Sequence, residues 1–288
     1  MTDPAVETAA ASALELIRDG MRVGLGTGHA AVAFLARLAD RVRSGLRVVG
    51  VPTSEATAAE ARSLGIPLGT LDDGQELAVT VDGADEVAPN LDLVKGFGGA
   101  LVRERIVAAA SHRQVILVGH DKLVDRLATR GRIPIEVVPF ACGLVLRRVR
   151  ALGLDPVIRL ADARPFISDN GNLTIDCGLA TPLADARAAR TLEADLRAIP
   201  GVVDTGLFLG TAERVLVGYP DGLVRALRKL QVAAERIPME RADPATAHLF
   251  IVNPLGKVDF ASLFSTHPAT DKRIARLNQI ARQTGDFS

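Results

Sequence analysis

Four apolar, strand-like runs of this chain each give way to glycines and to charged or hydroxyl-bearing residues, and this repeated pattern restricts the possible fold most strongly. Helical periodicity fills most of the intervals, and such β-α alternation predicts an α/β fold with a doubly wound, Rossmann-like sheet. Ligands bind outside the carboxyl ends of the strands in such sheets, so we expect the polar ends to converge on one crevice. The segments cover residues 23–30, 79–86, 95–104 and 115–122.

The order of the predicted elements changes after Gly131, where strand-like and helix-like segments follow one another as β-α-β-β-α-β. This order is typical of a split βαβ, ferredoxin-like unit. A further strand at 213–218 indicates that the unit is inserted into the first domain. We therefore predict a catalytic α/β domain over 1–130 plus 207–222, a small α+β domain over 131–206 that mediates oligomerisation, and a C-terminal extension over 223–288. In the small unit we expect strands at 133–138, 157–160 and 202–209, a hairpin at 166–175, and helices at 142–152 and 182–198.

Composition argues against several classes of partner. Lysine plus arginine and aspartate plus glutamate number 34 each, so no basic field attracts nucleic acid or an anionic membrane. No apolar run approaches the roughly 20 residues of a membrane helix, and the N-terminus lacks the features of a signal peptide. The two cysteines are too few for a disulfide scaffold. We expect a cytosolic protein that binds neither nucleic acid nor a membrane.

The segment 95–104 combines a lysine, three glycines and a glutamate. Its glycines allow a tight turn whose N–H groups point at negative charge. A predicted helix at 101–110 follows, and its dipole favours an oxyanion at the turn. Glu104 lies early in this helix and faces the crevice if the turn is tight. The alternative is an ordinary helix start with exposed Lys95 and Glu104.

Two aspartates, Asp82 and Asp85, follow another predicted strand. With Gly83 between them, two carboxylates at a strand end can hold sugar hydroxyls, and one can shuttle a proton. Aspartates that only form a turn are the alternative, because Asp-Gly favours turns. We interpret Glu86 as structural or solvated.

The turn Gly26-Thr27-Gly28 is suited to phosphate, since it precedes a predicted helix. It lacks the G-x-G-x-x-G spacing and the acidic residue of a dinucleotide site. Ser54 fits a helix N-cap better than a ligand. The histidines and cysteines show no metal-ligand spacing, so we expect no metal site.

On these motifs the chain resembles the ribose-5-phosphate isomerase A family, from near the N-terminus to about Gly222. The resemblance implies interconversion of ribose 5-phosphate and ribulose 5-phosphate through an enediolate, without metal or organic cofactor, in a homodimer or homotetramer. It implies Glu104 as the base, Lys95 as the group that polarises the substrate oxygens, and Asp82 and Asp85 on the sugar hydroxyls and the ring-opening proton. Substrate contacts are implied for Thr27, Gly28, His29, Ala30, Asp82, Gly83, Ala84, Asp85, Lys95, Gly96, Phe97, Gly98 and Lys122. Without this context Lys122 reads as a surface lysine.

The chain departs from the family after Gly28. Family members usually continue with Ser-Thr, whereas this chain has His29-Ala30. Two hydroxyl donors are therefore replaced by one imidazole, which can carry charge. We expect a phosphate site with altered donors, and weigh it against a changed substrate or lost activity. A non-enzymatic phosphosugar sensor, an isomerase of a related sugar, and a phosphosugar hydrolase or deaminase are the rival functions.

Residues 223–288 resemble the C-terminal end of HtpX-type heat-shock metalloproteases, mainly through the block 264–268, Phe-Ser-Thr-His-Pro. The H-E-x-x-H zinc helix of those proteases is absent. We therefore expect no protease activity and no zinc site, and interpret the segment as an appended structural or docking extension.

Overall fold

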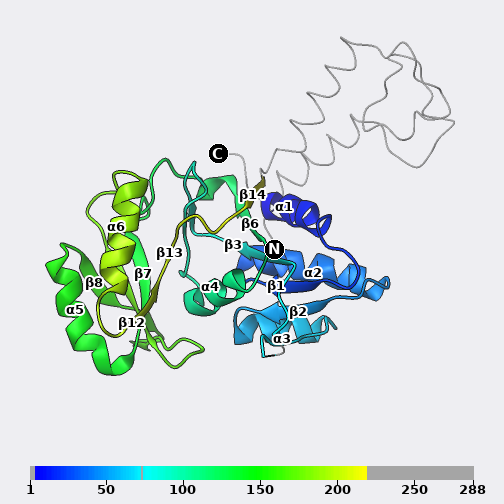
Figure 1. Cartoon of the computed structure of the whole chain (residues 1–288), viewed down its shortest axis with the longest axis horizontal. Helices are drawn as coiled ribbons and strands as arrows, with labels where there is room; N and C mark the ends of the chain where they lie inside the picture. The colour runs from blue at the N-terminus through cyan, green and yellow to red at the C-terminus, as the bar shows by residue number, and fades with distance from the viewer. Residues whose placement is uncertain (1–3, 73, 219–288) are drawn as a thin grey trace, which may run out of the picture. The chain divides into compact units, whose positions relative to one another are not determined.

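The computed structural model describes residues 4–72 and 74–218, and these residues contain a five-stranded parallel sheet in the order β14-β6-β3-β1-β2 (Figure 1). Its inner strands are almost continuous runs of buried Val, Leu and Ile, as expected for a sheet covered on both faces. The predicted doubly wound α/β fold is confirmed. The strands are β1 (Arg22–Leu25), β2 (Val49–Pro52), β3 (Val79–Gly83), β6 (Gln114–Gly119) and β14 (Arg214–Gly218).

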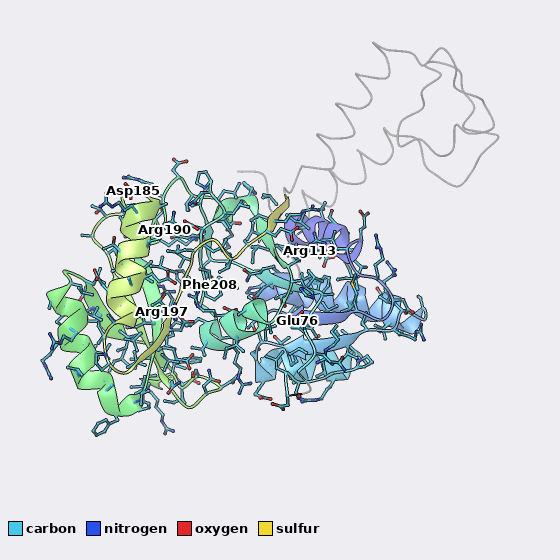
Figure 2. The ribbon with its side chains drawn as sticks, viewed as in Figure 1. Glu76, Arg113, Asp185, Arg190, Arg197 and Phe208 are labelled. Carbon is cyan, nitrogen blue, oxygen red and sulfur yellow. The ribbon has the colours of Figure 1, made fainter. Side chains whose placement is uncertain are left out.

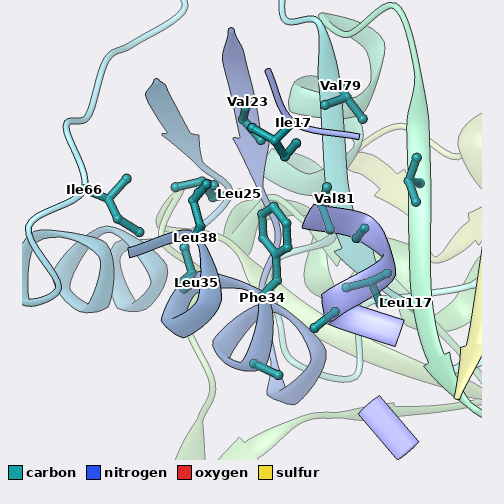
Figure 3. Close-up of a cluster of buried hydrophobic side chains, with 14 of the residues drawn as sticks. Ile17, Val23, Leu25, Phe34, Leu35, Leu38, Ile66, Val79, Val81 and Leu117 are labelled. Atoms are coloured by element: carbon teal, nitrogen blue, oxygen red, sulfur yellow. The ribbon is translucent and has the colours of Figure 1, made fainter. Parts of the chain in front are cut away.

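Helices cover both faces of this sheet. Val23 and Leu25 of β1 pack into a core that Figure 3 shows around Phe34. Gly24, between them in the alternating strand, faces Thr80 and Val107 on the opposite side. The first face belongs to α1 (Pro4–Leu14) and α2 (His29–Arg43), the opposite one to α4 (Leu101–Ala109), and α3 (Glu55–Ser63) follows β2.

A second, four-stranded antiparallel sheet has the order β12-β7-β11-β8. Two helices pack on it over a core that includes Ile135, Val149 and Leu196. Taken in chain order, this is the predicted split βαβ arrangement, which is confirmed. Residues up to Gly218 form one compact unit, and its division into a catalytic and a small domain stays a prediction. The elements are β7 (Arg132–Val137), α5 (Cys142–Ala151), β8 (Asp155–Ile158), β11 (Leu173–Gly178), α6 (Ala186–Arg197) and β12 (Val202–Thr205).

The expected strand at 202–209 is wrong in one respect, because it divides at Gly206. Its second part, β13 (Leu207–Phe208), pairs with β5 (Leu93–Val94), which pairs with β4 (Glu86–Val87) in a three-stranded antiparallel sheet. A Cβ at Gly206 would collide with the carbonyl oxygen of Lys95, so only glycine fits this crossing. Lys95 directly follows β5 and so lies at the end of an antiparallel strand. The other three polar segments predicted from the sequence, 23–30, 79–86 and 115–122, follow strands of the parallel sheet.

The expected hairpin at 166–175 is also only partly formed, since it has a single bridge in place of a ladder of paired residues. Only Ile167 and Leu173 form a bridge across the Asn-Gly turn. The chain before the turn instead forms a separate small ribbon, β9 (Leu160–Ala161) with β10 (Arg164–Pro165). Within the described residues, no helix is long and apolar enough to cross a membrane. The predictions for residues 223–288 lie outside the described part of the chain.

Candidate active site

Lys95 is the centre of a buried charge cluster at the carboxyl end of β3. Its backbone N–H donates to Gly206, and its side chain is only 2% exposed. The ammonium Nζ lies 3.0 Å from Asp82 Oδ2 and 3.4 Å from Glu104 Oε2, and donates to the carbonyl of Gly83 at 2.5 Å. Three of the four predicted catalytic residues therefore meet at one ammonium group.

Asp82 joins this cluster to the first glycine turn. Its Oδ1 accepts hydrogen bonds from the backbone N–H groups of Thr27, at 3.2 Å, and Gly83, at 2.7 Å. A Cβ at Gly26 would collide with the Asp82 side chain, so that position requires glycine. Asp82 thus uses one oxygen to fix the backbone and the other to hold Lys95.

Glu104 is the acidic residue in the first turn of α4, and its backbone N–H donates to Ala100 at 2.9 Å. Burial raises the pKa of Glu104 to about 8; Lys95 opposes the shift, and the carboxylates of Asp82 and Asp85 add to it. A carboxyl with a pKa near the operating pH is well suited to take and return a proton. Glu104 thus lies buried beside Lys95, and the expectation that it faces a crevice stays a prediction.

The pKa values of Lys95 and Asp85 are also shifted from their ordinary values. Burial alone lowers the pKa of Lys95, but attraction to Asp82 and Glu104 outweighs it, so the pKa is raised and the ammonium is retained. Burial raises the pKa of Asp85 against the N–H of Phe97 and the charge of Lys95. The Phe97 N–H donates to Asp85 Oδ2 at 2.9 Å, which links the aspartate to the second glycine turn.

The first glycine turn, Gly26-Thr27-Gly28, is more open than the Lys95 cluster. Gly28 has a left-handed φ of 99° and immediately precedes α2. Both Gly28 and His29 are exposed, while a Cβ at Gly83 would lie 3.5 Å from the Ala30 Cβ. The turn therefore presents a helix N-terminus and an imidazole to solvent beside the aspartate turn.

The Thr27 hydroxyl points into the protein. It lies 2.7 Å from Thr53 Oγ1, 2.9 Å from Ser54 Oγ and 3.2 Å from Thr57 Oγ1. Ser54 Oγ also accepts from the Thr57 N–H, which agrees with its predicted role as the N-cap of α3. This hydroxyl cluster fixes the position of the turn. The role of Thr53 and Thr57 in it was not predicted, because neither residue belongs to a recognisable sequence motif.

The remaining predicted contacts differ in their surroundings. Lys122 ends a short 3₁₀ helix, half-exposed, with Nζ 3.3 Å from Asp121 Oδ2, and its charge acts on Asp85. Glu86 is fully buried and accepts from the Arg130 N–H, so the structural interpretation holds and the solvated one is wrong. Ala84 packs against an apolar cluster.

Two residues of the site carry no sequence signal. Phe208, labelled in Figure 2, lies beside α4, with its ring centroid 4.1 Å from the Arg105 guanidinium and 5.6 Å from Lys95 Nζ. Such cation–π contacts help to retain a buried ammonium. Arg159, which contacts the second glycine turn, is likewise distant in sequence from every motif. Among the described residues, no group of three or more His, Cys, Asp or Glu side chains is placed to hold a metal ion.

The chain matches known proteins over most of its length. The protein-family model "Ribose 5-phosphate isomerase A (phosphoriboisomerase A)" matches residues 49–222. The ribose-5-phosphate isomerase A of Roseiflexus castenholzii is 49% identical over 219 residues, which are 75% of this chain and 92% of that protein. The isomerase A of Gloeobacter violaceus is 49% identical over 218 residues, which are 75% of this chain and 93% of that protein.

Solved structures agree with these matches. The ribose 5-phosphate isomerase A of Methanocaldococcus jannaschii is 39% identical with a TM-score of 0.71, and the match covers 76% of this chain and 96% of that one. A D-ribose-5-phosphate isomerase in complex with phospho-erythronic acid is 36% identical with a TM-score of 0.73, over 77% of this chain and 97% of that one. The chain belongs to the ribose-5-phosphate isomerase A family, whose members interconvert ribose 5-phosphate and ribulose 5-phosphate in the pentose phosphate pathway.

Proposed function

We propose that this isomerase moves one proton between C2 and C1 of its substrate through Glu104. The carboxylate of Glu104 takes the C2 proton of ribose 5-phosphate, and the electron pair moves onto the aldehyde oxygen to give an enediolate. The hydroxyl proton on O2 passes to O1, and the Glu104 carboxyl returns its proton to C1 to give ribulose 5-phosphate. The observation that carries this assignment is the buried contact between Glu104 and the Lys95 ammonium.

Lys95 and the aspartates would divide the remaining work. The Lys95 ammonium, held by Asp82, stabilises the negative charge of the enediolate. Asp85 is half-buried with a raised pKa, and a carboxyl of that kind can pass the proton that opens the sugar ring. Both carboxylate oxygens of Asp82 contact protein groups, one the backbone N–H groups of Thr27 and Gly83 and the other the Lys95 ammonium. This supports a role for Asp82 in orienting Lys95 and the sugar hydroxyls.

The phosphate group would bind at the exposed first glycine turn. Backbone N–H groups at the start of α2 and the helix dipole favour an anion there. His29 and Ala30 stand where family members usually have Ser-Thr, so one imidazole replaces two hydroxyls. Lys122 adds a positive charge near the same end of the sheet. The solved relative that holds phospho-erythronic acid supports a phosphorylated sugar as the ligand.

A coupled assay that compares ribose 5-phosphate with unphosphorylated ribose tests this function. We expect rapid formation of ribulose 5-phosphate and little or no turnover of ribose, because the phosphate anchors the substrate. Equal turnover of both sugars would show that the first glycine turn does not bind phosphate. Binding of ribose 5-phosphate without turnover would favour the phosphosugar sensor.

We also propose that the chain forms a homodimer or homotetramer through the small unit, 131–206. The support is a set of exposed apolar side chains on that unit: Phe140 is 100% exposed, Val157 57% and Leu160 61%. Ile158, in the same strand as Val157, instead packs partly into the small core. Sedimentation at micromolar concentration should show an oligomer, and Phe140→Asp should lower its mass if this surface is the interface. A monomer in the unmodified chain would contradict the proposal.

We propose a cytoplasmic location. Cys142 and Cys177 are both unpaired, and Cys177 is buried, as suits a reducing compartment. Fractionation of the native host cells would test this, and recovery from a secreted fraction would contradict it.

A further inference from the structure

The second glycine turn, residues 96–99, is held from the side of the four-stranded sheet by Arg159. This arginine directly follows β8, and its Nη1 donates to the carbonyl oxygens of Gly96, at 2.8 Å, and Phe97, at 3.0 Å. The other nitrogens of its guanidinium bond to both carboxylate oxygens of Asp176, at 3.0 and 2.5 Å. A fork of this kind binds a carboxylate in one fixed orientation.

The pair of Arg159 and Asp176 is well protected and anchored. Both side chains are 13% exposed, so solvent weakens their attraction less than at the surface. Asp176 lies within β11, and the Arg159 N–H donates to Thr174 of the same strand at 2.9 Å. A second arginine of the sheet, Arg132, places its guanidinium 4.2 Å from the centre of the Phe97 ring. Residues of the four-stranded sheet therefore hold the turn in two ways: Arg159 bonds to the carbonyls of the turn, and Arg132 contacts the ring of Phe97, the one large side chain in the turn.

The hydrogen bonds from Arg159 to the two carbonyls also fix the direction of the N–H groups of Phe97 and Gly98. In a trans peptide group the carbonyl and the N–H point in opposite directions. The carbonyl of Gly96 points to Arg159, and the N–H of the same peptide group, on Phe97, points away from it and donates to Asp85. By the same geometry, the Phe97 carbonyl on Arg159 turns the Gly98 N–H away from the arginine.

Gly98 lies on the open side of the turn. It is exposed, and a Cβ built on it would lie 3.9 Å from the Thr27 methyl group, so it faces the first glycine turn. Within the described residues, no protein acceptor receives the Gly98 N–H. On the closed side, a Cβ at Gly99 would collide with the Phe166 ring, so the turn has no room to relax that way.

We propose that Arg159, oriented by Asp176, is a positioning residue of the isomerase: it fixes the peptide groups at 96–98 so that the Gly98 N–H is a preorganised donor to the enediolate oxygen. The inference rests on the proposed function, because that function supplies the enediolate. Arg159 acts here through the backbone. A donor aimed in advance stabilises developing charge without reorganisation during the reaction.

The experiment compares the full-length chain with its Arg159→Met and Arg159→Lys variants. Arg164→Met is the matched control, since Arg164 is an exposed arginine on the neighbouring ribbon β10. Two probes separate the two turns: inorganic phosphate reports the phosphate site alone, and phospho-erythronic acid adds a carboxylate that mimics the charge of the enediolate. Binding of both is measured by calorimetry beside kcat and KM.

In Arg159→Met we expect both kcat and the affinity for phospho-erythronic acid to fall by up to about 100-fold, the cost of misplacing a group by about 1 Å, which is less than the complete loss of an oxyanion donor. The affinity for inorganic phosphate should stay within about twofold, since the first turn keeps its own contacts. Arg159→Lys should lose less, because one ammonium can reach a carbonyl or Asp176 but cannot replace the fork. The control should match the unmodified chain.

A folded Arg159→Met variant with unchanged kcat and unchanged affinity for phospho-erythronic acid would overturn the proposal. Equal losses for both probes would also overturn it, because they would mean that Arg159 supports the fold in general. If Arg159→Met does not fold, Arg159→Lys decides on the same readouts, and full activity there refutes the role. Failure of the unmodified chain to isomerise or to bind phospho-erythronic acid would count instead against the proposed function.

Discussion

The two ends of the candidate site are built in opposite ways. Around Lys95 the protein buries two carboxylates and an ammonium, with the ammonium 3.0–3.4 Å from the carboxylate oxygens. Around Gly28 it leaves a glycine and a histidine exposed at the start of α2. Burial raises the pKa of Glu104 at the first end, whereas the second end relies on backbone dipoles in contact with solvent.

This difference predicts which kinetic constant the Lys95 end and the Gly28 end of the site should each control. A buried acid with a raised pKa is suited to the proton transfer, and therefore to kcat. If the exposed helix N-terminus binds the phosphate as proposed, it does so equally in the ground state and the transition state, and therefore controls KM. Substitutions at the two ends should therefore change different constants.

The largest effect is expected from Glu104→Gln, which keeps size and hydrogen bonding but removes the base. We expect kcat to fall by about 10²–10⁴-fold, the usual contribution of a general base, while KM changes little. Steady-state kinetics with ribose 5-phosphate measure both constants. Glu60→Gln, on exposed α3 surface, is the control and should be neutral. Near-normal turnover in Glu104→Gln would remove this residue from the role of base.

A pH titration should reveal the raised pKa of Glu104. A base must be deprotonated, so kcat/KM should rise with pH and level off above a pKa of about 8. Asp85→Asn should move this rise to lower pH, since the Asp85 charge adds to the raised pKa. A profile whose midpoint stays in place in Asp85→Asn would show that the titrating group is not Glu104.

The same group should affect folding. A carboxyl whose pKa is raised in the folded state favours that state below its ordinary pKa of 4.5. This contribution is lost as the pH rises toward about 8. The melting temperature of the unmodified chain should therefore decline over this window relative to Glu104→Gln. Parallel melting curves for the two proteins across the window would contradict the assignment.

A smaller effect, on the other kinetic constant, is expected from His29, which is exposed at the start of α2. If its ring donates a hydrogen bond to the phosphate, His29→Ala should raise KM while kcat changes little, because this contact is made equally in the ground state and the transition state. Steady-state kinetics with ribose 5-phosphate measure both constants. An unchanged KM in His29→Ala would mean that backbone N–H groups bind the phosphate without His29.

Sequence patterns predicted what is local and periodic. The start of α5 at Cys142 and the position of Glu104 in the first turn of α4 follow from apolar periodicity and glycine placement. The division of the predicted strand 202–209 at Gly206 did not, because it depends on the close approach of the Lys95 carbonyl, more than 100 residues earlier in the chain. Arg159 was missed for the same reason: its partners, Gly96 and Phe97, are set by the contact of two sheets.

The smallest effect is expected from removing the C-terminal extension. Every residue assigned to the site, Arg159 and Phe208 included, lies between Gly26 and Phe208, and the last described strand, β14, ends at Gly218. The family model also ends at residue 222. Truncation after Gly222 should therefore leave kcat and KM within a few-fold of the full chain while changing oligomer size or aggregation. Kinetics and sedimentation of both proteins decide this, and a truncated chain that is folded and soluble but inactive would mean that residues after Gly222 complete the catalytic site.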